Sequence, residues 1–475
     1  MKLSAFNVFV DGFPDPDSTL VYNTFSGGFV SLDAETLAVL KKADAGGELD
    51  SAERELIDPD FFDDSVGILV ESRAAEERAY RDHLKAWKGS TKRLDCIVST
   101  TLACNLDCTY CCQADVLNGK TMSAATGAAT AEWLAQRVLE IGAGVVDLAF
   151  IGGEPLLHPG RIRQIVEGVR AGTAGAGVEV RFMLITNGVL MTRALVEELV
   201  PLGLYRAKVT LDGDETTHSL TRRSKKKGDD SYATVFKNVV EASRLIHVYL
   251  NGNYTEDTVG GFVPLLEKLV EAGFKPGSLI HFSPALQGLG APPEAGLGGC
   301  NYSSSHPEWL LPLADAVRRA GFEPVDDTNI GPCAFHRSHS YSIDPEGHIY
   351  KCPGFLGKPE WAVGRVESGL TDRYARQVAV NPQRGCGSCA HRPECAGGCV
   401  AAEWINAGRM EGVNCEIGFY ETYQAEFIKR KYLLATSDTV EEALSRFPAT
   451  PVTLPHPRDT LRRHTGQVSL RVLAA

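Results

Sequence analysis

Three cysteines stand close together in the segment Cys104-Asn105-Leu106-Asp107-Cys108-Thr109-Tyr110-Cys111. Thiolates at this CxxxCxxC spacing can hold three irons of a [4Fe–4S] cube, a cluster that normally takes four thiolates. The fourth iron would then be open to an exchangeable ligand, which suits chemistry better than electron storage. Zinc is the alternative, but zinc prefers paired CxxC units with a fourth Cys or His, and no nearby residue completes such a set.

A second set of seven cysteines lies in the last third of the chain. The first two cysteines are isolated in the sequence, and a glycine lies five positions before the second. Four more cysteines follow at CxxCx5Cx3C spacing, and one last cysteine comes after them. The set comprises Cys333, Cys352, Cys386, Cys389, Cys395, Cys399 and Cys415. A zinc ribbon is the alternative, but it needs four ligands and not seven interleaved ones. With no export signal expected, these thiols indicate metal ligands or redox groups more than disulfides.

Polar and glycine-rich segments recur between the two cysteine sets. The glycines of Gly152-Gly153-Glu154-Pro155 let the backbone approach a ligand closely, and Glu154 offers an acceptor for an ammonium group. Thr186-Asn187-Gly188 comes next, then Thr210-Leu211-Asp212-Gly213 with His218 and Arg222 behind it. The guanidinium of Arg222 suits a carboxylate. His218 could equally be a loop or helix-cap residue.

Six β-like runs alternate with helical patterns and would position these segments. The runs are Cys96–Thr101, Val145–Ile151, Val178–Thr186, Arg206–Leu211, Ile246–Tyr254 and Ser278–Ser283, and the helical patterns are Ala124–Ile141, Thr192–Leu202, Tyr232–Leu245 and Thr258–Ala272. Such alternation predicts βαβ units and a parallel sheet in an α/β fold. Six repeats in place of eight predict a partial (β/α)6 barrel. Each motif falls at the end of a strand, where parallel α/β folds carry their reactive groups.

Together the CxxxCxxC loop, GGEP and the T-LDG…His…Arg segment resemble the radical S-adenosylmethionine (SAM) enzymes, in their peptide-modifying branch. The resemblance implies that Cys104, Cys108 and Cys111 bind the radical cluster. It also implies SAM contacts from Tyr110 (adenine), Gly152, Gly153 and Glu154 (amino group), Thr210 (ribose), Arg222 (carboxylate), and Thr186 and Asn187. Asn251 and Asn253 could line the same site or cap a turn.

The seven late cysteines resemble the SPASM domain, a C-terminal extension of radical SAM peptide maturases. That resemblance implies two auxiliary [4Fe–4S] clusters, three clusters in all. The first would use Cys333, Cys352 and Cys399, and the second Cys386, Cys389, Cys395 and Cys415. Cys300 could supply the fourth ligand of the first cluster, or one iron stays open.

One position departs from the related anaerobic sulfatase-maturating enzymes, in which a catalytic aspartate follows the cysteine that matches Cys352. Here that position is Pro353, which cannot transfer a proton. Asp344 or Glu346 could replace it, and we assign no catalytic residue from the sequence.

The ends of the chain carry none of these motifs, and we divide it into four parts. Residues 1–90 form a cap, or a module resembling the winged-helix domains that bind leader peptides along a sheet edge. Strands are expected at Leu20–Tyr22 and Gly28–Leu32 and a helix at Ala34–Lys42. Residues 91–300 form the radical SAM core, 301–420 the SPASM domain and 421–475 a helical tail that packs the auxiliary domain or closes the barrel.

Length and composition limit the remaining possibilities. With 475 residues, 44% hydrophobic and 23% charged, the chain is typical of a soluble globular protein of two or three domains. No apolar run approaches the length of a membrane span, so we expect no membrane association and a cytoplasmic location. The net charge of −12 argues against nucleic-acid binding.

The resemblance implies an enzyme that generates a 5′-deoxyadenosyl radical and removes hydrogen from a peptide, making a thioether or carbon–carbon crosslink or a related oxidation. Its partners would be a peptide or protein substrate and a low-potential donor, flavodoxin or ferredoxin. The alternatives are a formylglycine-generating sulfatase maturase, a maturase of a redox-cofactor precursor, and a non-catalytic iron–sulfur electron carrier.

Overall fold

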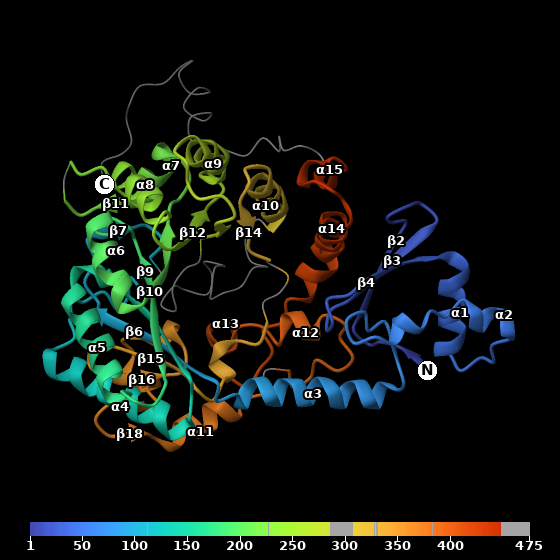
Figure 1. Cartoon of the computed structure of the whole chain (residues 1–475), viewed down its shortest axis with the longest axis horizontal. Helices are drawn as coiled ribbons and strands as arrows, with labels where there is room; N and C mark the ends of the chain where they lie inside the picture. The colour runs from blue at the N-terminus through green and yellow to red at the C-terminus, as the bar shows by residue number, and fades with distance from the viewer. Residues whose placement is uncertain are drawn as a thin grey trace, which may run out of the picture.

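A large, mainly parallel sheet runs through the middle of the computed structural model (Figure 1). The structure describes residues 1–111, 113–226, 228–285, 307–326, 328, 331–381 and 383–447, without the side chains of Pro307 and Asn406. Cys112 and Cys300 lie outside the described residues, so the predicted role of Cys300 is not addressed by the structure.

All six predicted strands are present and pair in parallel. They are β6 (Arg93–Thr101), β8 (Val145–Gly152), β9 (Glu179–Thr186), β10 (Leu204–Thr210), β12 (His247–Tyr254) and β13 (Leu279–Pro284), joined in the order β13-β12-β10-β9-β8-β6. The predicted α/β fold is confirmed.

Both edges of this sheet are extended by strands from later in the chain. β14 (Glu323–Pro324) pairs in parallel with β13, and β15 (Ser340–Ile343) pairs in parallel with β6. Antiparallel strands β16 (His348–Tyr350), β17 (Gly364–Arg365) and β18 (Gly369–Leu370) continue from β15. The proposed auxiliary domain is therefore built onto the first barrel strand, and the sheet does not stop at a boundary near residue 300.

Helices cover one face of the sheet (Figure 1). They are α4 (Ala124–Ile141), α5 (Pro159–Gly172), α6 (Arg193–Leu199), α7 (Glu215–Thr221), α8 (Ser231–Ala242), α9 (Phe262–Glu271) and α10 (Leu310–Arg319). α4 shows why the boundaries fall where they do: the Ser123 side chain caps the first turn, and Gly142 ends the helix at a φ of 68°. The predicted bounds of α4 are confirmed, whereas α5, α7 and α10 were not predicted.

Side chains alternate across the sheet with the period of two that a strand imposes. On β8, Val146, Leu148 and Phe150 face the helices and are fully buried, whereas Val145, Asp147 and Ala149 point to the opposite face and are half-buried. We call that opposite face the inner face. The large core therefore lies between sheet and helices, and the inner face borders a more accessible space.

The first residues form a separate antiparallel sheet of β2 (Asn7–Asp11), β3 (Ser18–Asn23) and β4 (Phe29–Asp33), followed by α1 (Ala34–Asp44) and α2 (Ser51–Glu55). The two predicted strands and the helix are present, and β2 was not expected. β1 (Lys2–Leu3) pairs with β5 (Leu69–Val70), and the long α3 (Arg73–Gly89) leads to the large sheet (Figure 1).

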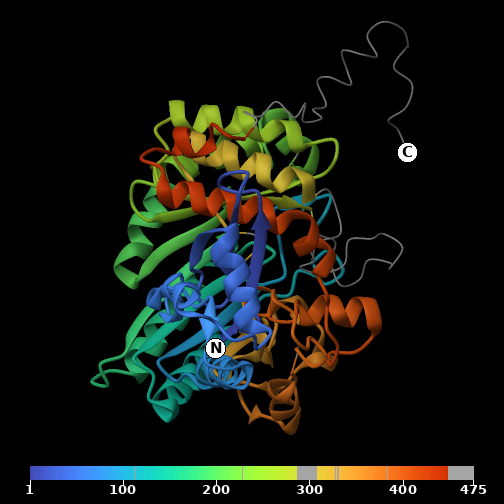
Figure 2. The same ribbon diagram turned by 90° about the vertical axis from the view of Figure 1, so that its right-hand side faces the viewer.

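The last helices complete this N-terminal sheet. α14 (Ile417–Thr436) and α15 (Val440–Leu444) lie beside β2–β4 (Figure 1 and Figure 2) and share an apolar core with that sheet. Phe419 and Phe427 of the same helix α14 join the large core. The helical tail thus links the N-terminal module to the barrel, a wider role than the predicted one.

The remaining elements are short. They are β7 (Leu106–Cys108), β11 (Arg222–Ser224), α11 (Asp372–Ala379), α12 (Arg392–Cys395), α13 (Val400–Ala407) and 3-10 turns at Pro59–Phe62, Pro155–Leu157, Val200–Leu202, Val259–Gly261, Pro307–Trp309, Ala334–His336, Pro353–Phe355 and Pro359–Trp361. In the part of the chain that is described, no helix is long and apolar enough to cross a bilayer.

Candidate active site

The three-cysteine loop lies at the C-terminal edge of the large sheet. Within it, β7 pairs antiparallel with β11, which places Cys108 opposite Arg222. The thiols of Cys104, Cys108 and Cys111 lie close enough to influence one another electrostatically. Burial raises the pKa of Cys108 to about 11, and the guanidinium of Arg222 opposes that shift. A cationic partner for thiolates is therefore already in place.

The spacing of the sulfurs speaks against a mononuclear zinc site. A tetrahedral zinc with Zn–S bonds near 2.3 Å holds its sulfurs about 3.8 Å apart. Among the described residues, the one group of three or more Cys, His, Asp or Glu side chains whose ligand atoms lie within 4.8 Å of one another is Asp344, Glu346 and His348. No cysteine belongs to it, so the described thiols are spread more widely than one zinc ion requires.

Two glycines form a cradle against the cluster loop. Gly152 has a φ of 148°, and a Cβ on it would lie 2.1 Å from the carbonyl oxygen of Thr101. A Cβ on Gly153 would lie 2.2 Å from the carbonyl oxygen of Ala103, the residue before Cys104. Backbone hydrogen bonds run from Gly153 N to Thr101 O at 3.0 Å and from Glu154 N to Ala103 O at 2.8 Å. Only glycine lets the end of β8 approach the loop this closely.

The carboxylate of Glu154 is fully buried and joins the ends of two strands. It accepts hydrogen bonds from Thr186 Oγ1 at 2.7 Å, Asn187 N at 2.8 Å and Leu156 N at 2.9 Å. Burial raises the pKa of Glu154, and these three donors oppose the shift. The side chain therefore has a structural role that the sequence did not reveal, and its contact with a SAM amino group stays a prediction.

Tyr110 is the centre of a hydrogen-bond network. Its hydroxyl donates to Asp212 at 2.5 Å and accepts from Arg222 Nη1 at 2.9 Å and Asn253 Nδ2 at 3.1 Å. Asp212 also accepts from the backbone N–H of Asn253 at 2.8 Å and from Thr221 Oγ1 at 3.0 Å. The ends of β10 and β12 are thereby tied to the cluster loop.

Sequence reasoning quoted Asp212 without assigning it a function and left Asn253 undecided. The signal for Asp212 was its place in the T-LDG segment, but its partners Tyr110 and Asn253 come from a loop about a hundred residues earlier and a strand about forty residues later. Asn105 was also missed: its Oδ1 accepts from Asn187 Nδ2 at 2.7 Å, next to Cys104. Thr210, the predicted ribose contact, ends β10 on the inner face and pairs with Asn251.

Two buried nitrogens at this site have no hydrogen-bond partner in the described part of the chain. They are Nε of Arg222, whose side chain is 6% exposed, and Nε2 of His218, one helical turn earlier. An unpartnered buried guanidinium N–H is costly unless a ligand meets it. The glycine cradle, the three thiols and this nitrogen fit a cluster with a carboxylate-bearing ligand such as SAM.

The comparison with protein families decides the class of this domain. Residues 98–263 match the family model described as the Radical SAM superfamily. The chain contains a radical SAM domain. That range runs from β6 into α9 and includes the three cysteines, the glycine cradle, Asp212 and Arg222. The family predicted from the sequence is therefore confirmed for this domain.

Curated relatives match a limited part of the chain. A GTP 3′,8-cyclase from Chlorobaculum tepidum is 38% identical over 130 residues, 27% of this chain and 36% of the cyclase. An AdoMet-dependent heme synthase from Methanosarcina barkeri is 37% identical over 116 residues, 24% of this chain and 29% of the synthase. The match thus spans about a third of the length of these relatives.

Solved structures extend the likeness of fold. The structure of native anSMEcpe with bound AdoMet, an anaerobic sulfatase-maturating enzyme, has a TM-score of 0.56 at 16% identity and covers 72% of this chain and 100% of its own. The same protein with AdoMet and the Cp18Cys peptide has a TM-score of 0.53 at 18% identity, covering 72% and 97%. At such identity the likeness concerns the fold alone.

Three late cysteines, Cys333, Cys352 and Cys399, come together beside the inner face. Burial raises the pKa of the Cys352 thiol, and the charges of Cys333 and Cys399 raise it further, so the three lie close to one another. They pack around one apolar cluster with Ile151 of β8. These are the three residues that the resemblance assigned to the first auxiliary cluster.

The other four late cysteines form a second group nearer the surface. Burial raises the pKa of Cys386, and the charges of Cys389 and Cys415 add to that shift. Burial likewise raises the pKa of Cys395 to about 11, with a contribution from Cys386. Cys415 is exposed. The grouping agrees with the ligand sets that the resemblance implied, and iron binding stays a prediction.

The segment that carries the second group is held by the N-terminal module. The hydroxyl of Tyr22 on β3 donates to Glu394 at 2.7 Å, and that of Tyr80 on α3 donates to the backbone oxygen of Arg392 at 3.1 Å. The guanidinium of Arg392 lies 4.8 Å from the ring centre of Tyr80, within cation–π range.

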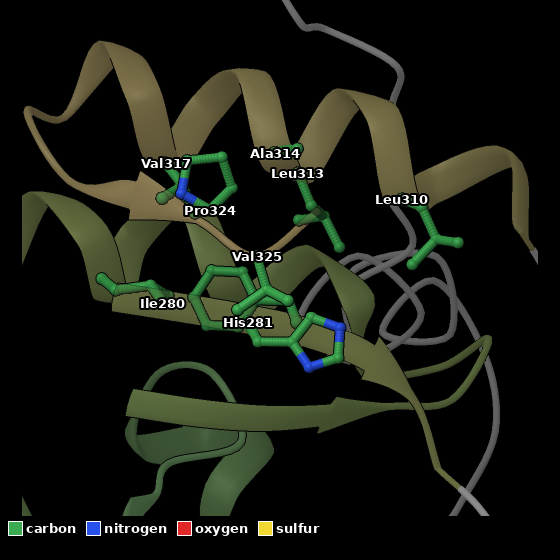
Figure 3. A pocket seen from close by; sticks show the side chains of 9 residues that line it. Ile280, His281, Leu310, Leu313, Ala314, Val317, Pro324 and Val325 are labelled. Atoms are coloured by element: carbon green, nitrogen blue, oxygen red, sulfur yellow. The ribbon is translucent and has the colours of Figure 1, made fainter. Parts of the chain in front are cut away.

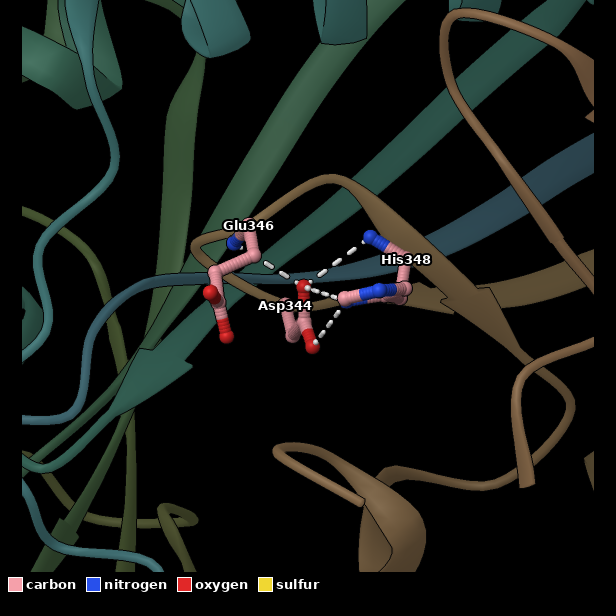
Figure 4. A group of neighbouring side chains, drawn as sticks. All are labelled: Asp344, Glu346 and His348. Atoms are coloured by element: carbon pink, nitrogen blue, oxygen red, sulfur yellow. Dashed lines mark hydrogen bonds and ion pairs between the residues drawn. The ribbon is translucent and has the colours of Figure 1, made fainter. Parts of the chain in front are cut away.

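Asp344 and Glu346, the possible replacements for the aspartate absent at Pro353, lie in the turn between β15 and β16 (Figure 4). Asp344 accepts from the backbone N–H groups of Glu346 and His348, both at 2.9 Å, and from Tyr350 OH at 2.8 Å. Glu346 pairs with Lys120 at 2.7 Å. Both carboxylates therefore stabilise local structure, and neither gains support as a proton acceptor.

Proposed function

We propose that the chain is a radical SAM enzyme that modifies a peptide. The observation that carries the proposal is that both cysteine groups border the end of β8: Gly153 lies against Cys104 of the CxxxCxxC loop, and Ile151 packs with the cluster that contains Cys333, Cys352 and Cys399. A radical cluster and an auxiliary cluster would then share one substrate space. Residues 301–420 would serve as the SPASM domain.

Cys104, Cys108 and Cys111 would hold the radical [4Fe–4S] cluster, and Gly152, Gly153 and Arg222 would hold SAM. When bound, this pair of cofactors supplies a 5′-deoxyadenosyl radical that removes a hydrogen atom from a carbon of the substrate. The glycines keep the cluster loop against β8, as their contacts with Thr101 and Ala103 indicate.

The protein's own groups orient and insulate this site. Tyr110 is fixed between Asp212 and Arg222, so its ring is available as a wall for the adenine. The late cysteines would hold two auxiliary clusters, which could take up the electron that a substrate radical releases; their potentials would depend on ligation and exposure. A low-potential flavodoxin or ferredoxin and a cytoplasmic location complete the proposal.

A formylglycine-generating sulfatase maturase is the second candidate, favoured by the likeness of fold to anSMEcpe. Pro353 counts against it, because no carboxylate follows Cys352. A GTP 3′,8-cyclase is favoured by curated relatives, but the first of those matches covers 27% of this chain and 36% of the cyclase. An electron carrier has no use for the glycine cradle and the buried Arg222.

The test is anaerobic reconstitution, counting of iron and sulfide, and reduction with dithionite in the presence of SAM. We expect about twelve irons per chain for three cubes and formation of 5′-deoxyadenosine. Bound zinc without SAM cleavage would contradict the radical chemistry. About four irons with cleavage would remove the support that the late cysteines give to a peptide maturase.

A further inference from the structure

A buried lysine lies next to the first group of late cysteines. Lys351 follows β16, directly precedes Cys352 and is only 2% exposed. Lysine is almost never fully buried unless its charge is paired. The charged groups that act on it within the described residues are Cys333, Arg337 and Lys88, and none of them is a carboxylate. The fold therefore buries a positive charge without a carboxylate to balance it.

Uncharged groups hold the ammonium of Lys351 in place. Its Nζ donates to the backbone oxygens of Arg337 at 2.5 Å and Ser340 at 2.6 Å, at the entry to β15. It also lies 5.3 Å from the ring centre of Tyr341 and 5.4 Å from that of Tyr374, within cation–π range. These contacts fix the position of the charge and leave it without a counter-charge.

The charge of Lys351 acts on the first group of late cysteines. Burial raises the pKa of Cys333, and Lys351 opposes that shift. Burial conversely lowers the pKa of Lys351 to about 7, and negative charge at Cys333 opposes that shift in turn. A cluster held by thiolates carries negative charge on its ligands, so it would favour the ammonium form further. The lysine and the cluster ligands thus stabilise each other's charged forms.

Other basic side chains add to the positive charge of this region. Next to burial, the charges of Arg337 and Lys88 lower the pKa of Lys351. Arg337 is ion-paired with Asp95, whereas Lys88, half-buried in the last turn of α3, has no ion pair in the part of the chain that is described. In a chain with a net charge of −12, positive charge behind one cysteine group is a local feature.

The second group of late cysteines has charges of both signs beside it. Burial raises the pKa of Cys386 and of Cys395; Arg392 opposes the shift at Cys386, and Glu416 adds to the shift at Cys395. The reduction potential of an iron–sulfur cluster depends on the charge around it, and a positive neighbour stabilises the more negative, reduced state. Lys351 would therefore raise the potential of a cluster in the first group, whereas the charges beside the second group act in opposite directions.

The narrow crevice between α10 and β13–β14 (Figure 3) is a weaker candidate for a further role. It is lined mainly by aliphatic side chains such as Ile280, Leu313 and Val317, where helix α10 packs on the sheet. It therefore offers little for the recognition of a polar or charged group.

We propose that Lys351 raises the reduction potential of the first auxiliary cluster, so that this cluster accepts the electron that the substrate radical releases. The inference rests on the proposed peptide maturase function. When a thioether forms, the carbon radical and a thiol join in a C–S bond, the S–H bond breaks and its proton leaves to solvent, and one electron passes to the cluster. Lys351 acts through the cluster and not on the substrate, so it is a positioning residue.

The test is a redox titration followed by electron paramagnetic resonance on the full chain, reconstituted anaerobically. Cys104, Cys108 and Cys111 are replaced by alanine throughout, so that only the auxiliary clusters contribute. In this background the chain with Lys351 intact is compared with Lys351→Gln, which keeps donors for the two backbone oxygens without the charge, and with Lys351→Arg, which keeps the charge. Tyr374→Phe is the matched control, because it removes a hydroxyl that donates to the backbone oxygen of Ser338 beside the same ammonium and changes no charge.

One of the two midpoint potentials should fall in Lys351→Gln. We expect the ratio of reduced to oxidised cluster at a fixed potential to fall about tenfold, which is about 59 mV for a one-electron couple. A unit charge about 10 Å away, at an effective dielectric constant of about 20, has an effect of this order. The other midpoint should stay in place as an internal reference, and Lys351→Arg and Tyr374→Phe should leave both midpoints where they are.

Several outcomes would overturn the inference. They are an unmoved pair of midpoints in Lys351→Gln, an equal shift of both midpoints, a shift as large in Lys351→Arg or Tyr374→Phe, and loss of a cluster from Lys351→Gln, which would make the lysine necessary for assembly. The iron count of the background protein with Lys351 intact separates this failure from that of the proposed function. Clearly fewer than about eight irons per chain, the content of two cubes, would count against the proposed function itself and remove the inference with it.

Discussion

Replacing Gly153 with alanine should displace the loop that carries Cys104, Cys108 and Cys111 and leave the rest of the fold in place. The added Cβ would stand 2.2 Å from the carbonyl oxygen of Ala103 and 3.0 Å from the Cβ of Cys104. Both contacts are with the cluster loop, and the nearer one is with backbone, which has no rotamer to change. The loop would have to move by about 1 Å to restore an ordinary van der Waals separation.

That displacement sets the expected loss in the rate of SAM cleavage. Moving the loop stretches the hydrogen bonds from Gly153 N to Thr101 O and from Glu154 N to Ala103 O, which now measure 3.0 and 2.8 Å. A misplacement of about 1 Å at a reacting centre costs about 100-fold in rate. We therefore expect Gly153→Ala to form 5′-deoxyadenosine about 100-fold more slowly and to lose up to about four of its irons, one cube.

The assay is a time course of 5′-deoxyadenosine under dithionite, with iron counted on the same preparation. Gly160→Ala is the matched control, because a Cβ there meets nothing within 4 Å and the residue lies in the first turn of α5. The control should cleave SAM as the unchanged chain does. If Gly153→Ala kept full iron and a rate within about threefold, a difference of about 0.65 kcal/mol, the cradle would not be what positions the loop.

Three further changes test other parts of the structure. Tyr110→Phe leaves the Nη1 donor of Arg222 without its acceptor, so we expect the free energy of unfolding to fall by about 1–3 kcal/mol. The measurement is urea unfolding, and an unchanged midpoint would contradict a stabilising role for this hydrogen-bond network. Burial, aided by two nearby lysines, lowers the pKa of His336 to about 4. Since the unfolded chain takes up this proton near pH 6.5, stability should fall by up to about 1.4 kcal/mol per unit as pH drops from 6.5 towards 4, and His336→Gln should flatten that slope in melting temperatures. Ile428→Ala, at a buried position under the N-terminal sheet, should cost about 2–5 kcal/mol and speed proteolysis of that sheet, whereas Val440→Ala, at a site 41% exposed, should do neither.

The sequence predicted the strands of the large sheet well because their alternation with helices is regular. It did not predict α5, which begins at Pro159 and contains three glycines, residues that disfavour a helix. The structure explains two of them: a Cβ on Gly168 or Gly172 would lie 2.7 or 2.6 Å from the Cβ of Ala131 or Ala135 on α4. Close packing between the two helices therefore overrides intrinsic propensity.

Pairings between distant segments were also invisible in the sequence. β15 is four residues long, and its parallel pairing with β6 joins segments more than two hundred residues apart. No local pattern encodes such a partner, so the extension of the sheet into the cysteine-rich region is evident only from the structure.

At the site, residue type and spacing were enough to predict a role for the cysteines. They were not enough to identify the residues that hold the surrounding loops and strand ends in place. CxxxCxxC is rare enough to point to a cluster, and the structure groups the thiols accordingly. Asp212 and Glu154 are ordinary acidic residues in sequence, and their importance comes from burial and from partners supplied by other strands. Such roles depend on tertiary contacts and leave no local signal.

The shared core of the N-terminal sheet and α14–α15 has a consequence for biosynthesis. Val10, Leu20 and Tyr22 are made first, while the side chains that cover them, such as Ile428 and Leu444, are made among the last. At roughly 5–20 residues per second, on the order of 20–80 seconds pass between the two. Throughout that interval the nascent sheet has an uncovered apolar face at the ribosome, so production of this protein should depend on chaperones that bind nascent chains.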